Sequence, residues 1–198
     1  MLRELVVASH NKGKIAEFEN MLEPFGVKVF SAVDLNLPDV EETGKTFEEN
    51  AVLKAETLAE ICNKPCLADD SGLCVDALGG RPGVYSARYA PNRDFDKAMG
   101  MLVGEIRETK KDDWNAHFSC VLALKVPNQK TEVFEGRVDG KIIEEKRGDN
   151  GFGFDPIFVP DGFEKTFAEM SAEEKKIISH RGRALEKFLR KVFDGQNI

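Results

Sequence analysis

The sequence predicts an α/β protein with a mixed, twisted β-sheet, and three observations support this class. In the first half, short apolar segments alternate with longer segments whose apolar residues recur at the helical period. In the second half, residues 115–126 alternate between apolar and polar side chains, which is typical of a half-buried antiparallel strand. Asp139-Gly140 lies between residues 132–138 and 141–145 and indicates a hairpin. Helices that follow strands, together with an antiparallel meander, favour a mixed sheet covered by helices.

The first strand is predicted at residues 4–9 and the second at residues 27–33. Between them, Asn11 is suited to cap a helix that ends near Gly26. Thr46 and Glu49 form a capping box, which predicts that the next helix begins there and continues to about residue 62.

Residues 65–69 then form a short apolar strand, and we expect the chain from Asp69 onward to be its exit loop. Residues 95–106 have a helical apolar period. Ser171 and Glu174 open a short helix, and Ser179 caps the last one.

Composition limits the classes of function. The chain has 198 residues, 41% hydrophobic and 32% charged, with a formal net charge of −7. We therefore expect a single globular domain over residues 1–198, and the acidic balance argues against unspecific binding to nucleic acid or to an anionic membrane. The apolar run near the N-terminus is too short for a signal peptide, and no segment is long enough to span a membrane, so we expect a cytoplasmic protein. The four cysteines form no CxxC pair and are interpreted as reduced, mostly buried thiols.

A first candidate site is the segment SHNKGK at residues 9–14, between a strand and a helix. Unpaired N–H groups at a helix start attract phosphate, and Lys12 and Lys14 add positive charge. The alternative is a capped surface helix with solvated lysines.

A second candidate site is acidic. Asp69 and Asp70 are adjacent after an apolar segment, and Glu41 and Glu42 are adjacent in another loop. Two carboxylates at so short a separation repel each other, so a cation is expected beside them. Mg²⁺ takes one or two carboxylates together with water and substrate phosphates. Solvated surface glutamates are the alternative for Glu41 and Glu42.

Two further segments are suited to recognise a base. Residues 148–160 combine glycines with Phe152 and Phe154, whose rings could stack on a base or fill the core. In SHRGRAL at residues 179–185, His180 and Arg181 lie in the first turn of a helix, where their donors could address a purine. A structural histidine is the alternative for His180. Residues 79–90 form a long loop with two arginines and two tyrosines.

The order of these motifs resembles the inosine triphosphate pyrophosphatase family. The resemblance runs from Ser9 to Leu185 and includes SHNKGK, EETGKTFEENAVLKA, ADDSGL, GGRPGVYSARYA, GFGFDPIF and SHRGRAL. It implies an elongated mixed sheet flanked by helices in two lobes with a central cleft, and a homodimer. It also implies Mg²⁺-dependent hydrolysis of ITP, dITP and XTP to the monophosphate and pyrophosphate, which clears these nucleotides from the pool.

The resemblance also implies roles for individual residues. Glu41 and Asp70 match the metal ligands, Asp70 also matches the proton acceptor, and Asp69 and Lys54 support catalysis. His10 replaces the usual glycine of the phosphate-binding turn. The residues matched to substrate binding are Ser9, His10, Asn11, Lys12, Gly13, Lys14, Ser71, Phe152, Gly153, Phe154, Asp155, Lys175, His180 and Arg181.

Two alternatives remain open at this point. A nucleotide-binding module without catalysis would use the same phosphate turn and aromatic loop, although the acidic set has no evident purpose in a pure binder. A related pyrophosphatase that acts on modified pyrimidine nucleotides is the other. A kinase is disfavoured because the sequence contains no P-loop.

Overall fold

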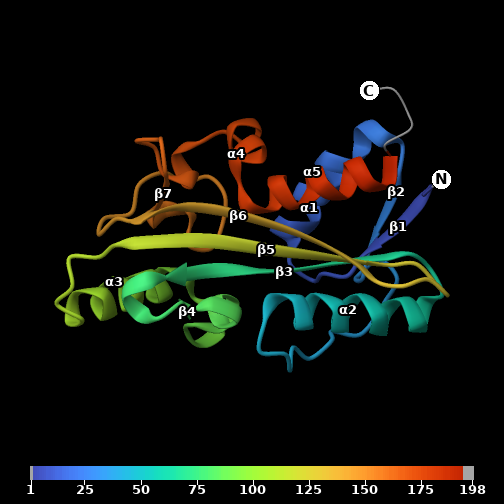
Figure 1. Cartoon of the computed structure of the whole chain (residues 1–198), viewed down its shortest axis with the longest axis horizontal. Coiled ribbons are helices and arrows are strands. Elements are labelled where there is room, and N and C mark those ends of the chain that lie inside the picture. Colours follow the sequence, from blue (N-terminus) through green and yellow to red (C-terminus); the bar gives the residue numbers. More distant parts are fainter. Residues whose placement is uncertain (1, 194–198) are drawn as a thin grey trace. The chain divides into compact units, whose positions relative to one another are not determined.

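A computed structural model of the chain describes residues 2–193 (Figure 1). The chain divides into two compact units. Of the described residues, unit 1 comprises 2–70, 121–135 and 184–193, and unit 2 comprises 71–120 and 136–183. The division falls within the strands β3 (Cys66–Val75), β5 (Asn115–Lys125) and β6 (Glu132–Ile142) and within the helix α5 (His180–Phe193), so each of these elements contributes to both units.

Unit 1 has a parallel sheet edge covered by α-helices, the last of which begins in unit 2. Strand β1 (Glu4–Val7) pairs in parallel with β2 (Lys28–Ser31) and with β3, and the order of strands is β2-β1-β3-β5-β6. Helix α2 (Phe47–Cys62) lies on one side of these strands, and α1 (Lys12–Leu22) and α5 (His180–Phe193) lie on the other (Figure 1). A short 3-10 helix, η1 (Glu23–Phe25), ends at Gly26.

The helix boundaries in unit 1 follow the predicted caps. The side chain of Asn11 accepts hydrogen bonds from the N–H groups of Gly13 and Lys14. Thr46 and Glu49 form both bonds of the capping box. These predictions are confirmed, because the capping residues satisfy N–H groups that the first helical turn cannot pair internally.

Unit 2 is built on antiparallel pairing. Strand β4 (Arg81–Pro82) pairs with β3, and β7 (Phe158–Pro160) pairs with β6. The helices are α3 (Phe95–Glu108) and α4 (Ala172–Ile178), together with the 3-10 helices η2 (Asp76–Leu78), η3 (Gly83–Arg88), η4 (Pro91–Arg93), η5 (Asp155–Ile157) and η6 (Phe167–Glu169). Parallel and antiparallel pairs both occur, so the predicted α/β class with a mixed sheet is confirmed.

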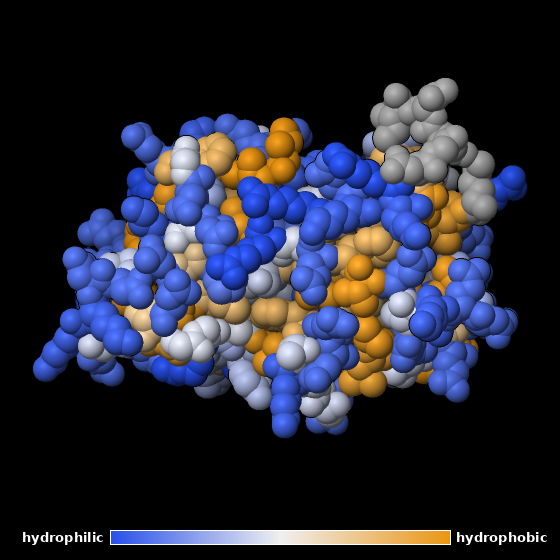
Figure 2. Space-filling view, in the orientation of Figure 1, coloured by the Kyte–Doolittle hydropathy of each residue, from blue (hydrophilic) through white to orange (hydrophobic). Residues whose placement is uncertain are grey.

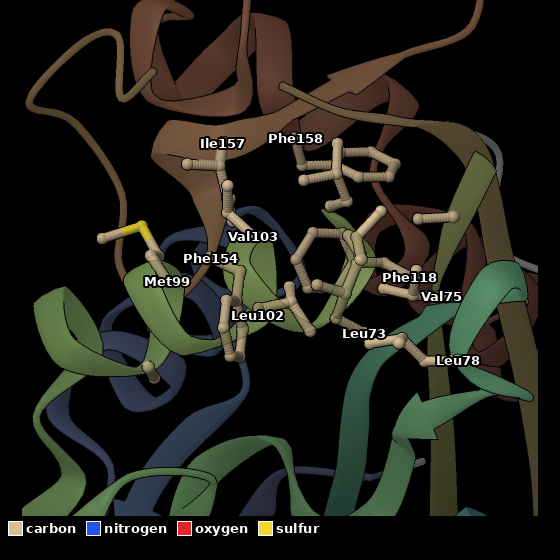
Figure 3. Packing of buried hydrophobic residues seen from close by; sticks show 14 of the residues in the cluster. Leu73, Val75, Leu78, Met99, Leu102, Val103, Phe118, Phe154, Ile157 and Phe158 are labelled. Carbon is tan, nitrogen blue, oxygen red and sulfur yellow. The ribbon is translucent and has the colours of Figure 1, made fainter. Parts of the chain in front are cut away.

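Each unit has its own hydrophobic core. In unit 1, small residues of α2 such as Ala51 and Ala55 pack against Val6 and Ala68. In unit 2, Phe118, Phe154 and Phe158 pack with residues of α3, including Leu102 (Figure 3). These residues are nearly inaccessible to solvent, and burial of this kind is the main favourable contribution to folding.

Two local predictions are wrong. The chain does not leave the sheet at Asp69, because β3 continues to Val75. The predicted hairpin at Asp139-Gly140 is also absent, because β6 runs without a break to Ile142. Gly140 is there for close packing: a Cβ atom at this position would lie 2.3 Å from the carbonyl oxygen of Val159 in β7.

The face of the molecule that Figure 2 shows is mainly hydrophilic. Hydrophobic patches lie between the hydrophilic residues. Among the described residues, no helix is both long enough and apolar enough to cross a membrane.

Candidate active site

Asp69 and Asp70 are buried in the middle of β3, where they are 2% and 4% exposed. Successive side chains of a strand point to opposite faces of a sheet, so the two carboxylates diverge. Helices α1 and α2 lie on these opposite faces in unit 1 (Figure 1), and each helix supplies one lysine. Adjacent buried carboxylates are therefore tolerated because each has its own cationic partner.

Asp69 is paired with Lys14 of α1. The Lys14 Nζ donates a hydrogen bond to Oδ1 of Asp69, and the Asp69 side chain is inaccessible to solvent. The phosphate turn predicted at residues 9–14 is thus attached to the acidic strand through its last lysine. Within this turn, the N–H of Asn11 donates to Oγ of Ser9 at 3.1 Å.

Two of the N–H groups expected to face phosphate are already used. The Oδ1 of Asn11 accepts from the N–H of Gly13 at 2.9 Å and from that of Lys14 at 3.3 Å. Lys12 is exposed. His10 lies 3.5 Å from the Asp39 carboxylate and 3.3 Å from the Leu37 carbonyl oxygen, so it connects the turn to the loop that carries Glu41 and Glu42.

Asp70 faces Lys54 of α2. The Lys54 Nζ lies 3.4 Å from Oδ1 of Asp70, 2.7 Å from Oε1 of Glu42 and 2.8 Å from the Asp69 carbonyl oxygen. Burial lowers the pKa of Lys54, but the attraction of Asp70 and Glu42 outweighs it and leaves this pKa above its ordinary value. Lys54 therefore remains a fixed positive charge.

Burial raises the pKa of Asp70 to about 6, against the opposing attraction of Lys54. The negative charge of Glu42 raises this pKa further. Oδ2 of Asp70 is buried and has no hydrogen-bond partner. An unpartnered buried carboxylate oxygen is unfavourable in a resting protein, so its presence points to a ligand or a proton.

Asn50 is a second unsatisfied group in the same place. It is fully buried on α2, and its Oδ1 accepts from the N–H of Gly44 at 2.8 Å, while Nδ2 has no partner. Its amide lies close enough to Asp70 to oppose the rise of that pKa. Asn50 thus bonds the acidic loop through Oδ1 and acts on Asp70 of β3 through its amide.

The donor set fits a hard divalent cation. Asp70 offers the unpartnered oxygen described above, and Glu42 lies next to the lysine that Asp70 contacts. Glu41, the expected ligand, is exposed. Among the described residues, no three His, Cys, Asp or Glu side chains are grouped closely enough to hold a metal by themselves. This is compatible with Mg²⁺, which usually takes only one or two carboxylates and completes its shell with water and phosphate.

A second cluster of predicted residues lies in unit 2, around Asp155. Its Oδ2 accepts from the Phe152 N–H at 2.9 Å and from Lys175 Nζ at 2.7 Å. The Lys175 Nζ lies 4.9 Å from the centre of the Phe152 ring. Asp155 thereby holds a loop whose aromatic ring is half-buried and faces a cation.

Arg181 belongs to the same cluster. It is 2% exposed, its Nη2 donates to Oγ of Ser71 at 3.0 Å, and its guanidinium lies 5.7 Å from the Phe152 ring centre. Ser71 follows Asp70 directly in β3. A buried guanidinium beside a half-exposed ring provides fixed donors next to a stacking surface.

Two predicted residues lie in the core of unit 2. Phe154 makes edge contacts with Tyr89 and Phe95. His180 is 4% exposed and stacks on Phe118 at 4.8 Å. Both positions correspond to the structural alternatives considered for these residues, and the assignment of the two to substrate binding remains a prediction.

The sequence reasoning missed Asn50 and gave Glu42 no role of its own. The only available signal for Asn50 was a polar residue on the inward face of a predicted amphipathic helix, near Ala51 and Ala55. Glu42 is half-buried and contacts Lys54, whereas Glu41 is exposed, and no spacing rule reveals this difference.

The fold and the clusters around Asp70 and Asp155 define a class of protein. It is an α/β protein with a mixed sheet, in which buried carboxylates form ion pairs with lysines of the helices. The model of the Ham1 family matches residues 5–191. The chain therefore belongs to the Ham1 family, and the resemblance inferred from six motifs is confirmed.

Several relatives and solved structures are similar over nearly the whole chain. A dITP/XTP pyrophosphatase of Bacillus licheniformis is 50% identical, covering 94% of this chain and 96% of the relative. A dITP/XTP pyrophosphatase of Agrobacterium fabrum is 48% identical, covering 94% of each. The structure of a HAM1 protein from Coxiella burnetii matches with a TM-score of 0.90 at 40% identity, covering 98% of this chain and 100% of that one.

Proposed function

We propose that this protein hydrolyses non-standard purine nucleoside triphosphates, namely dITP, ITP and XTP, to the monophosphate and pyrophosphate. The observation that carries the proposal is the buried Asp70, whose Oδ2 lacks a partner while Oδ1 faces Lys54. The names of the relatives support the substrate class. The reaction would clear these nucleotides from the cytoplasmic pool.

The proposal includes Mg²⁺ as cofactor. Asp70 and one acidic residue of the loop at 41–42 would hold it: the family resemblance favours Glu41, and the contact with Lys54 favours Glu42. When bound, the ion supplies positive charge to the triphosphate and acidifies water.

Asp70 is suited to accept the proton of the attacking water. A general base works best when its pKa lies near the working pH, and the raised pKa of about 6 makes Asp70 a stronger base than an ordinary aspartate. It is still mostly ionised at pH 7.5. Asn50 would hold the carboxylate in place through the amide that faces it.

Lys14 and Lys54 supply the fixed positive charge. Negative charge develops on the leaving pyrophosphate as the phosphoanhydride bond breaks, and preorganised cations stabilise it without reorientation. Both ammonium groups are already held by carboxylates in β3, so their positions are set before substrate binds.

The cluster in unit 2 would recognise the base. Phe152 offers a ring for stacking, and Arg181 offers donors to a 6-keto oxygen. Adenine carries an amino group there, so the same donors would be left unpaired. An unpaired buried donor costs about 1 to 3 kcal/mol, equivalent to roughly tenfold to a hundredfold in selectivity.

The test is a panel of triphosphates with and without Mg²⁺, with pyrophosphate and phosphate measured separately. We expect pyrophosphate from dITP, ITP and XTP, and far less from ATP, GTP and dATP. Turnover confined to modified pyrimidine nucleotides would favour the related pyrophosphatase. Tight binding without product would favour the non-catalytic module.

The proposal also includes a homodimer, which the family resemblance implies. Light scattering on the purified protein measures the mass directly. A mass close to twice that of the 22.1 kDa chain is expected, and a monomer at working concentration would contradict it.

A further inference from the structure

We propose that Cys62 and Cys66 are a redox-sensitive pair that closes to a disulfide under oxidation, and that closure slows the activity proposed above. The two Sγ atoms lie 3.5 Å apart, already in contact. A disulfide needs a separation of about 2.05 Å, so the sulfurs have to approach by only about 1.5 Å. The expected effect of the disulfide on activity rests on the proposed function, whereas its formation does not.

The two cysteines lie on elements that differ in freedom to move. Cys66 begins β3 and is fully buried in the core of unit 1. The preceding carbonyl oxygen, that of Pro65, accepts from the Val6 N–H at 2.9 Å, which attaches this end of β3 to β1. Cys66 is therefore the fixed partner.

Cys62 is the last residue of α2 and is half-buried. Asn63 follows in the left-handed conformation and ends the helix, and a connection of residues 63–65 returns the chain to β3. The last turn of a helix frays easily, so the sulfur of Cys62 can move toward that of Cys66.

The chemistry follows from this asymmetry. Burial raises the pKa of Cys66, so the more accessible Cys62 meets the oxidant first. With oxidised glutathione, the Cys62 thiolate attacks one sulfur, and the glutathione disulfide breaks as one thiolate leaves. Cys66 then loses its proton to water, attacks the Cys62 sulfur and expels the second glutathione thiolate. Two protein thiols are oxidised and one glutathione disulfide is reduced to two thiols.

Closure would act on the site because the same two elements carry it. Lys54 lies two turns before Cys62 on α2, and Asp69 and Asp70 follow Cys66 on β3. A shift of the helix relative to the strand alters the contact between Lys54 and Asp70, and displacements of about 1 Å can reduce turnover up to a hundredfold. We expect a fall of about tenfold.

The experiment treats the reduced full-length protein with oxidised glutathione, blocks the remaining thiols by alkylation and maps them by mass spectrometry. Wild type should lose two of its four thiols, both in the segment 62–66, and the chain should be lighter by two hydrogen atoms. Cys62→Ser should form no internal bond. Cys74→Ser is the matched control, because Cys74 is also half-buried, and it should behave like wild type.

Turnover of dITP is measured on the same samples. The expected result is a loss of about tenfold in oxidised wild type and Cys74→Ser, reversed by dithiothreitol and absent in Cys62→Ser. Thiols at Cys62 and Cys66 that remain open to alkylation, or a stable glutathione adduct on Cys62, would overturn the disulfide. A disulfide with unchanged turnover would overturn its effect on activity. A reduced protein that hydrolyses no triphosphate refutes the proposed function instead, and the thiol map still decides whether the bond forms.

Discussion

Replacing Asp70 by asparagine should stabilise the metal-free protein while disabling it. The substitution keeps the shape of the side chain and removes a negative charge that burial disfavours. The structure therefore predicts that exchanging one carboxylate oxygen for an amide nitrogen raises the stability of the protein and lowers its activity.

The size of the effect follows from the pKa. Burial raises the pKa of Asp70 from 3.8 to about 6. Each pKa unit corresponds to about 1.4 kcal/mol, so ionisation of Asp70 costs the folded state about 3 kcal/mol once the pH is well above 6. The sign is that of an acid whose pKa is raised by folding: the protonated form is favoured in the folded state, so stability is lost as the pH rises from about 4 through 6.

The assay is urea unfolding of wild type and Asp70→Asn at several pH values without divalent metal. The advantage of the variant should be about 3 kcal/mol at pH 8, about half of that at pH 5 and well under 1 kcal/mol at pH 4. Added Mg²⁺ should raise the stability of wild type and leave that of the variant unchanged. A variant that is less stable than wild type at pH 8, or a difference that does not change with pH, would refute the reasoning.

Three other substitutions test separate parts of the structure. Lys54→Met should destabilise the protein by roughly 3 to 5 kcal/mol in urea unfolding, because it leaves the buried carboxylate of Asp70 and the half-buried one of Glu42 without their cation, and an unchanged midpoint would contradict this. Gly140→Ala should destabilise the protein by roughly 1 to 3 kcal/mol, because its Cβ would overlap the backbone of β7. Gly100→Ala is the control: this position of α3 has open space around it, so the variant should be more stable by about 1 kcal/mol. Equal effects of the two substitutions would argue against close packing at Gly140. Arg181→Lys should lower the preference for dITP over dATP in kcat/KM by about tenfold, and an unchanged ratio would remove Arg181 from base recognition.

The caps and periodic segments were predictable from the sequence because they are local. Asn11, Thr46 and Ser171 each bond an N–H group within three residues, so their spacing alone determines the start of a helix. The helix at 95–106 was predictable for the same reason, since its apolar residues face one side.

The course of β3 was not predictable, because it depends on partners far away in the chain. Two adjacent aspartates and a glycine are ordinary signs of a loop, and contacts with Lys14 and Lys54 make the carboxylates acceptable inside a strand. The hairpin prediction failed for a related reason: Gly140 is required by the approach of β7, not by a turn. At Asp69-Asp70 and at Gly140, tertiary contacts determine the structure against the local preference of the sequence.

The types of residue in the candidate site were predictable from the sequence, but the contacts between them were not. The carboxylates and lysines were identifiable from their order in six motifs. The pairing of Glu42 with Lys54 and the burial of Asn50 depend on how loop 41–46 meets α2, which no pattern in the sequence specifies.

The rate of pyrophosphate release from dITP by wild type and Asp70→Asn, both with saturating Mg²⁺, tests the central claim most directly. If Asp70 accepts the proton of the attacking water, the variant should fold normally and turn over at least about a hundredfold more slowly than wild type. Equal rates, or a wild type that releases no pyrophosphate from dITP, would contradict it.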